Sequence, residues 1–149
     1  MYNKILVPLD LSEESEGVLP LVVDLLNPRG EGILLHVIPP GHVRSIGGVV
    51  QLASQIEEEA REKAMAYLKR LAGQFGDDSR QWSCAVSVSG SLPDEIVGFG
   101  LRESVDLIAM YTHDRKGLAK LVKGSVADKV QKKASIDVKL FRPRELVAR

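Results

Sequence analysis

The sequence predicts an α/β fold: a doubly wound parallel sheet with helices on both faces. Short apolar runs rich in strand-forming residues alternate with longer segments of helical periodicity, four times in succession. A final alternating run over residues 136–142 closes the series. Alternation of strands and helices favours parallel strands joined by right-handed crossovers. The 149 residues contain no internal repeat, linker or low-complexity segment, so a single domain over 1–149 is expected.

The first strand and helix illustrate the signals used. Residues 4–9 (KILVPL) are apolar on both faces, as in a central parallel strand. Ser12 is a good N-cap for a helix that should run to about Leu26, where residues 27–30 stop it. Pro20 lies inside that helix and removes one backbone donor. A bend is therefore expected at Pro20.

The same signals assign the rest of the chain. Apolar residues on one helical face define the longest helix, and paired prolines or glycines mark several ends. The expected elements are a strand over 32–38, a loop over 41–48, a helix over 49–76, a strand over 82–88, a helix over 93–103, a strand over 106–111, a helix over 119–134 and the strand over 136–142. Five strands in the order 3-2-1-4-5 with four main helices make a three-layer sandwich of flavodoxin-like or Rossmann-like type.

Composition excludes several classes of function. Lys plus Arg and Asp plus Glu both number 20, and this balance argues against non-specific binding of nucleic acid. The only cysteine, Cys84, excludes an internal disulfide and fits a reducing cytoplasm. The N-terminus lacks the apolar core of a signal peptide, and no apolar run is long enough to span a membrane. We therefore expect a cytoplasmic protein without a nucleic-acid or membrane partner.

Topology predicts where a ligand would bind. In an open doubly wound sheet, ligands bind at the carboxyl ends of the strands where the strand order reverses. Here the reversal falls between the first and fourth strands, and the start of the fourth helix adds free N–H groups. The residues expected at this mouth are Pro8, Leu9, Asp10, Met110, Tyr111, Thr112, His113 and Asp114.

The chain resembles the universal stress protein family at several points. KILVPLDLSEES is similar to the first strand and loop of that family, and ILLHVI to its second strand. The stretch from GSLPDEIV to DLIAMYTH resembles its third helix and fourth strand. GLAKLVKGSVADKV resembles its fourth helix and DVKLFRP its closing strand. The match covers nearly the whole chain in the right order, except for residues 40–76.

The resemblance implies a nucleotide motif that is only partly kept. Nucleotide-binding members carry the pattern G-x2-G-x9-G-[ST], which falls here on Tyr111, Asp114, Gly124 and Ser125. A phenol and a carboxylate thus replace two glycines. Glycine lets the backbone come within contact distance of a phosphate, and Asp114 would add negative charge beside it. ATP binding is therefore predicted to be weak or absent.

The adenosine side of the pocket is better kept. By resemblance, Asp10 stands where the family contacts the adenosine part, and Val37 lies on the adenine side. Gly124, Ser125 and Val126 resemble the phosphate side. A basic set could offset the charge of Asp114; it consists of Arg115, Lys116, Lys120 and Lys123.

No catalytic or metal-binding constellation is visible in the sequence. His36, His42 and His113 are not spaced as metal ligands, and no Ser–His–Asp or Cys–His set can be assembled. His36 is expected in the core or at a rim, and Cys84 as an inert buried thiol. No catalytic residue is predicted. Slow ATP hydrolysis, the most that is expected, would have only Asp10 and Asp114 as metal ligands.

The final strand predicts a homodimer. Ile136, Val138 and Leu140 alternate with Asp137 and Lys139 on what should be an uncovered sheet edge. In the family this strand often pairs with its twin across a two-fold axis. We therefore expect dimerisation through residues 136–142.

These observations favour a non-catalytic stress-response module with an adenosine-type pocket; the only cofactor considered is ATP or AMP with Mg²⁺. Three alternatives stay open. The protein could be a true ATP-binding universal stress protein that acts as a nucleotide-dependent switch or slow ATPase. It could be a nucleotide transferase of the wider adenine-binding α/β group. A flavin protein is disfavoured because few aromatic residues lie near the mouth.

Overall fold

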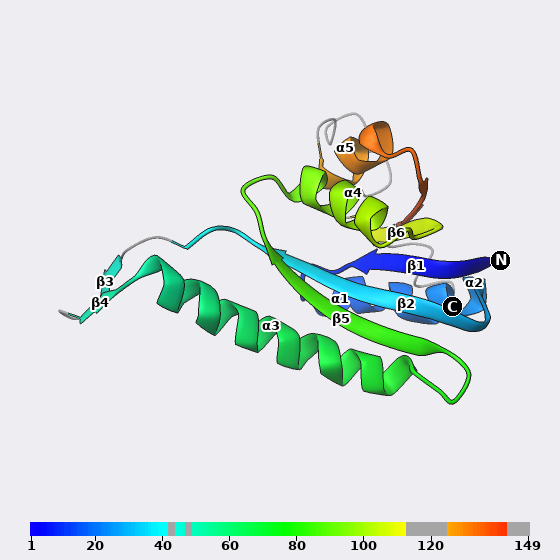
Figure 1. The fold of residues 1–149 in the computed structure, drawn as a ribbon, viewed down its shortest axis with the longest axis horizontal. Coiled ribbons are helices and arrows are strands. Elements are labelled where there is room, and N and C mark those ends of the chain that lie inside the picture. The colour runs from blue at the N-terminus through cyan, green and yellow to red at the C-terminus, as the bar shows by residue number, and fades with distance from the viewer. Residues whose placement is uncertain (42–43, 47–48, 113–124, 143–149) are drawn as a thin grey trace.

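The computed structural model describes residues 1–41, 44–46, 49–112 and 125–142. Its main sheet contains five parallel strands: β1 (Tyr2–Pro8), β2 (Leu26–Ile38), β5 (Gln81–Val88), β6 (Leu107–Tyr111) and β7 (Asp137–Phe141). Their order is β5-β2-β1-β6-β7, which confirms the predicted order 3-2-1-4-5 (Figure 1). The two edges of the sheet are therefore β5 and β7.

Helices cover both faces of this sheet. They are α1 (Glu13–Glu16), α2 (Val18–Leu25), α3 (Ala53–Phe75), α4 (Leu92–Arg102) and α5 (Val126–Lys133). Helices α1, α2 and α3 lie on one face, and α4 and α5 lie on the other (Figure 1). The core consequently has two parts, here called the α1–α3 cluster and the α4–α5 cluster. Strand β1 contributes Ile5 and Val7 to the first cluster and Leu6 to the second, as expected for a central strand.

The first helical segment is interrupted one turn earlier than predicted. Gly17 separates α1 from α2, and Pro20 lies in the first turn of α2. There its missing N–H has no intrahelical acceptor to lose, whereas in a continuous helix its ring would clash with the carbonyl of Glu16. The break at Gly17, three residues before Pro20, removes that conflict; the bend at Pro20 itself stays a prediction.

The helix ends at Leu25, within one residue of the prediction, but the strand that follows begins earlier than expected. Strand β2 already begins at Leu26, which pairs with Tyr2, and the next pair joins Glu31 to Lys4. The residues between them form an irregularity in which Arg29 has a φ of 69°. The turn signals of this segment are thus accommodated inside a longer strand.

The region before α3 differs most from the prediction. Part of the expected loop forms β3 (Arg44–Ile46), which pairs antiparallel with β4 (Val49–Gln51). The helix expected from Val49 instead begins at Ala53. β-Branched residues such as Val49 and Val50 favour strands over helices, a preference that the helical spacing had outweighed. The β3–β4 hairpin lies at the far end of α3, away from the main sheet (Figure 1).

The last helix also begins later than predicted. Ser125 is its N-cap, with extended backbone and a side-chain oxygen that accepts a hydrogen bond from the backbone N of Asp128 at 3.1 Å. A helix that runs through Ser125 is therefore wrong; residues 119–124 lie outside the described part of the chain. The consequence is a helix N-terminus at Ser125, close to the ends of β1 and β6.

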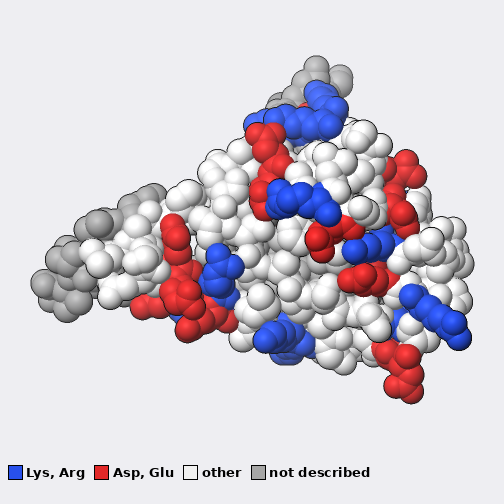
Figure 2. Space-filling view, in the orientation of Figure 1, with Lys and Arg blue, Asp and Glu red and all other residues white. Residues whose placement is uncertain are grey.

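Charged side chains of both signs are interspersed on the face shown in Figure 2. Acidic side chains gather over the first half of α3, which carries Glu57, Glu58, Glu59 and Glu62. Among the described residues, no helix is long and apolar enough to cross a membrane.

Candidate functional site

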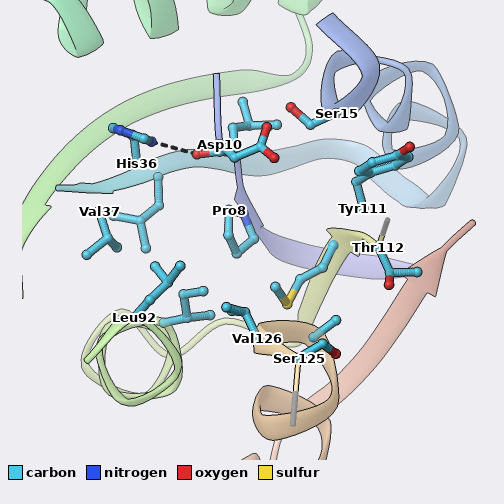
Figure 3. Close-up of a pocket in the computed structure, with 15 residues that line it drawn as sticks. Pro8, Asp10, Ser15, His36, Val37, Leu92, Tyr111, Thr112, Ser125 and Val126 are labelled. Atoms are coloured by element: carbon cyan, nitrogen blue, oxygen red, sulfur yellow. Dashed lines mark hydrogen bonds between the residues drawn. The ribbon is translucent and has the colours of Figure 1, made fainter. Parts of the chain in front are cut away.

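A cavity of about 260 Å³ opens at the carboxyl ends of β1, β2 and β6 (Figure 3). Its walls are predominantly apolar and come from strand ends, from the first turn of α4 and from the start of α5. It lies between β1 and β6, where the strand order reverses, as the topology predicted.

Every predicted site residue within the described part of the chain lines this cavity. These residues are Pro8, Leu9, Asp10, Val37, Met110, Tyr111, Thr112, Ser125 and Val126. Asp114 and Gly124 lie outside the described residues, as do His113 and the basic set of Arg115, Lys116, Lys120 and Lys123. The fold therefore brings the two predicted strand ends and the start of the last helix to one place.

Asp10 is held in a tight turn at the end of β1. Its Oδ1 accepts hydrogen bonds from the backbone N of Ser12 at 2.9 Å and from Ser12 Oγ at 2.6 Å. Between them, Leu11 has a φ of 66°, in the left-handed region that favours glycine. This turn fixes the carboxylate at the mouth of the cavity (Figure 3).

His36 ties the residue before Asp10 to β2. Its Nδ1 lies 2.7 Å from the carbonyl oxygen of Leu9 (Figure 3). A carbonyl oxygen only accepts, so Nδ1 must carry the proton of this bond. The backbone N of Leu9 also donates to the carbonyl of Leu35 at 2.8 Å. His36, expected in the core or at a rim, is a rim residue of the cavity.

Met110 and Tyr111 point to opposite sides of the sheet. Met110 belongs to the α4–α5 cluster, whereas Tyr111 packs against the α1–α3 cluster. Figure 3 accordingly shows the Tyr111 ring on the side of Asp10 and Ser15, across the cavity from Ser125. The Tyr111 phenol thus fills space beside α1.

The start of α5 supplies backbone donors at the opposite wall. Ser125 caps the helix, and the backbone N of Lys129 donates to the carbonyl of Ser125 at 2.9 Å. The N–H groups of Val126 and Ala127 have no intrahelical acceptor because they lie in the first turn. Such groups, together with the helix dipole, favour an anion. Asp128 brings a negative charge to the same turn and pairs with Lys132 at 3.2 Å.

The model of the Universal stress protein family matches residues 1–142. This chain belongs to the universal stress protein family. Universal stress protein MJ0577 of Methanocaldococcus jannaschii is 29% identical over 148 residues, which cover 91% of each chain. Its solved structure superposes on this fold with a TM-score of 0.76 at 26% identity and covers 95% of this chain and 96% of its own. The solved structure of a universal stress protein in complex with cAMP has a TM-score of 0.61 at 18% identity. This match covers 94% of the present chain and 97% of that protein's chain.

Several residues that line the pocket of this universal stress protein were not predicted: Ser15, Leu35, His36, Leu92, Ile96 and Ala127. Leu92 and Ile96 come from the first turns of α4, one helical turn apart, and cover the mouth beside Val37. The i, i+4 spacing of Leu92 and Ile96 can be recognised in the sequence. Only the packing of α4 in the fold shows that these two side chains line the pocket. Thr112, 6% exposed, follows β6, and its backbone N donates to the carbonyl of Phe141 at 2.9 Å.

Within the described ranges, this universal stress protein shows no group of three or more His, Cys, Asp or Glu residues that could hold a metal ion. Cys84 on β5 is half-buried, and burial raises the pKa of its thiol, which favours the unreactive protonated form. Among the described residues, the polar groups at the pocket are the Asp10 carboxylate, the His36 imidazole, a few hydroxyls and the donors at the start of α5.

Proposed function

We propose that this universal stress protein is a non-catalytic, cytoplasmic stress-response module whose pocket takes the adenosine part of a nucleotide. One observation carries the proposal. Asp10 and Val37, the residues matched to the family's adenosine side, line one cavity at the switch point of the sheet. A carboxylate beside an apolar slot suits a ligand with vicinal hydroxyls and a flat aromatic base.

The shape and polarity of the cavity support this ligand class. Pro8, Val37, Leu92 and Val126 provide apolar walls on which a purine can lie (Figure 3). Asp10 can accept hydrogen bonds from ribose hydroxyls, because an ionised carboxylate is an acceptor only. A protein of the same fold has been solved in complex with cAMP, an adenine nucleotide, which is consistent with the proposal.

Weak or absent affinity for a triphosphate follows from the motif positions. Tyr111 and Asp114 stand where nucleotide-binding relatives carry glycine. Side chains there keep the backbone from approaching phosphate oxygens, and the carboxylate of Asp114 repels them. We therefore propose that the pocket binds adenosine in preference to ATP, because it lacks the glycines that would let the backbone contact phosphate.

A second candidate function is an ATP-dependent switch with at most slow hydrolysis. The start of α5 favours it, because Val126 and Ala127 present backbone donors at the cavity wall. Lysines and arginines of the segment before α5 would then take over from the missing glycines. This function requires Mg²⁺ with the nucleotide.

Calorimetric titration of nucleotide-stripped protein with adenosine and, separately, with MgATP tests both candidates. We expect adenosine binding that is weakened but still measurable in Asp10→Ala, and no tighter binding of MgATP. Tighter binding of MgATP than of adenosine would favour the switch. Absence of adenosine binding would overturn the proposed function. Turnover of MgATP that disappears in Asp10→Ala would show an enzyme.

A further inference from the structure

The segment that carries Asp10 does not hold its own shape. Leu11 has a φ of 66°, a conformation that L side chains rarely adopt. The helix that follows, α1, is four residues long and ends at Glu16, with Gly17 as its C-cap. So short a helix has no intrinsic stability. Contacts from elsewhere must therefore hold this segment.

A chain of hydrogen bonds joins the Asp10 carboxylate to α1. Ser12 donates to Asp10 Oδ1 from both its backbone N and its hydroxyl. The Ser12 hydroxyl in turn accepts from the backbone N of Ser15 at 3.2 Å, and Ser15 Oγ donates to the carbonyl of Ser12 at 2.9 Å. The position of Asp10 thus follows the position of the single turn of α1.

The far end of α1 is fastened to α3. The hydroxyl of Tyr67 donates a hydrogen bond to Oε2 of Glu16, which is the last residue of α1. Arg70, one turn further along α3, lies 3.7 Å from the same oxygen, and its guanidinium lies 4.9 Å from the centre of the Tyr67 ring. Leu68 and Leu71 beside them are fully buried, so this part of α3 is a fixed support.

We propose that Tyr67, which does not line the pocket, is the positioning residue that holds the Asp10 carboxylate in place for its ligand. The inference rests on the proposed function and adds a residue that the family motif does not contain. It acts from one side, while His36 and Leu35 hold the residue before Asp10 from the other. Burial and, to a smaller extent, the hydrogen bond to Glu16 raise the pKa of Tyr67 to about 12. The hydroxyl is therefore protonated and able to donate at neutral pH.

The first test is a double-mutant cycle on adenosine affinity. Tyr67→Phe removes only the hydroxyl and should weaken binding by about 2- to 150-fold, the range for coupled neighbours. In an Asp10→Ala background the same change should have no further effect. Tyr2→Phe is the matched control, since Tyr2 packs against the same α1–α3 cluster as Tyr67 and does not line the pocket. Equal losses in both backgrounds would overturn the proposal, because Tyr67 would then act on the pocket in general.

A second test needs no ligand. In Tyr67→Phe, amide exchange should become faster over residues 12–17 and stay unchanged in β2, as measured by mass spectrometry at neutral pH. Glu16→Gln, which keeps an acceptor oxygen, should retain slow exchange, whereas Glu16→Ala should match Tyr67→Phe. Unchanged exchange in Tyr67→Phe would refute the tether. Should the wild type bind no adenosine, the proposed function fails, and this exchange experiment alone decides whether Tyr67 holds the Asp10 segment.

Discussion

The Tyr111 side chain occupies one side of the pocket and lies across the cavity from Ser125 at the start of α5. The alternation of β6 turns its ring toward the α1–α3 cluster, while Met110 faces α4 and α5. The ring therefore stands beside Asp10 and Ser15, where a glycine would leave open space (Figure 3). Under the proposed function, Tyr111 acts by filling that space rather than by contact with the start of α5.

Restoring both motif glycines should raise ATP affinity. In Tyr111→Gly with Asp114→Gly, the backbone can approach phosphate oxygens and a repelling charge is removed, so we expect at least a tenfold gain, about 1.4 kcal/mol. Calorimetry with MgATP measures it. Asp114→Gly alone serves as the companion variant, because removal of the packed Tyr111 ring also costs about 3 kcal/mol or more of stability. Unchanged ATP affinity in the folded double variant would contradict our account of weak binding.

At the scale of elements, the two edges of the sheet, β5 and β7, differ in how they are protected from pairing with other chains. Strand β5 carries no charged residue from Gln81 to Val88, and such an edge is prone to pair with other chains. At its end, the backbone N of Ser89 donates to the carbonyl of Ile38. The alternation of a parallel ladder therefore turns the backbone groups of Val86 outward. Arg61 of α3 occupies this edge, because its Nη1 donates to the carbonyl of Val86 at 2.8 Å.

Removal of this guanidinium should expose the β5 edge. We expect Arg61→Ala to form concentration-dependent oligomers larger than those of the wild type, measured by light scattering at matched protein concentrations. Lys63→Ala, which removes an exposed cation of the same helix, is the control. Identical masses for Arg61→Ala and Lys63→Ala at every concentration would show that Arg61 does not protect the edge.

The strands and their order were predictable because buried parallel strands are short, apolar and sharply bounded. The β3–β4 hairpin was not, since the apolar face of α3 continues in phase through Val49 and Leu52 and imitates a longer helix. The start of α5 could have been found. Ser125 and Asp128 have the S-x-x-D spacing of an N-terminal capping signal, which the longer helical pattern concealed.

The candidate site was predictable to the extent that it lies on strand ends. Asp10 and Val37 follow from the switch point and from the family resemblance. Leu92 and Ile96 depend on how α4 packs over the mouth, which no local pattern contains. The support of Asp10 by Tyr67 joins residues 51 positions apart, Glu16 and Tyr67, and such pairings are fixed only by the whole fold.

At the scale of the whole molecule, the expected homodimer through the last strand stays a prediction. β7 is a sheet edge, and its alternation of Val138 and Leu140 with Asp137 and Lys139 suits pairing with its twin. Light scattering at high protein concentration should give twice the monomer mass. Val138→Pro, which cannot donate on the outer edge, should give a monomer, and Lys132→Ala on α5 should not. A purely monomeric wild type would contradict the prediction.

The hydrogen bond from Arg61 to Val86 also affects how many copies of the chain can join through their sheet edges. A sheet with two accepting edges can add copies head to tail without limit, and such a contact produces a filament. A sheet with one accepting edge can join only one other copy, after which neither partner offers a further place. With the Arg61 guanidinium on β5, we therefore expect any assembly through β7 to join no more than two sheets.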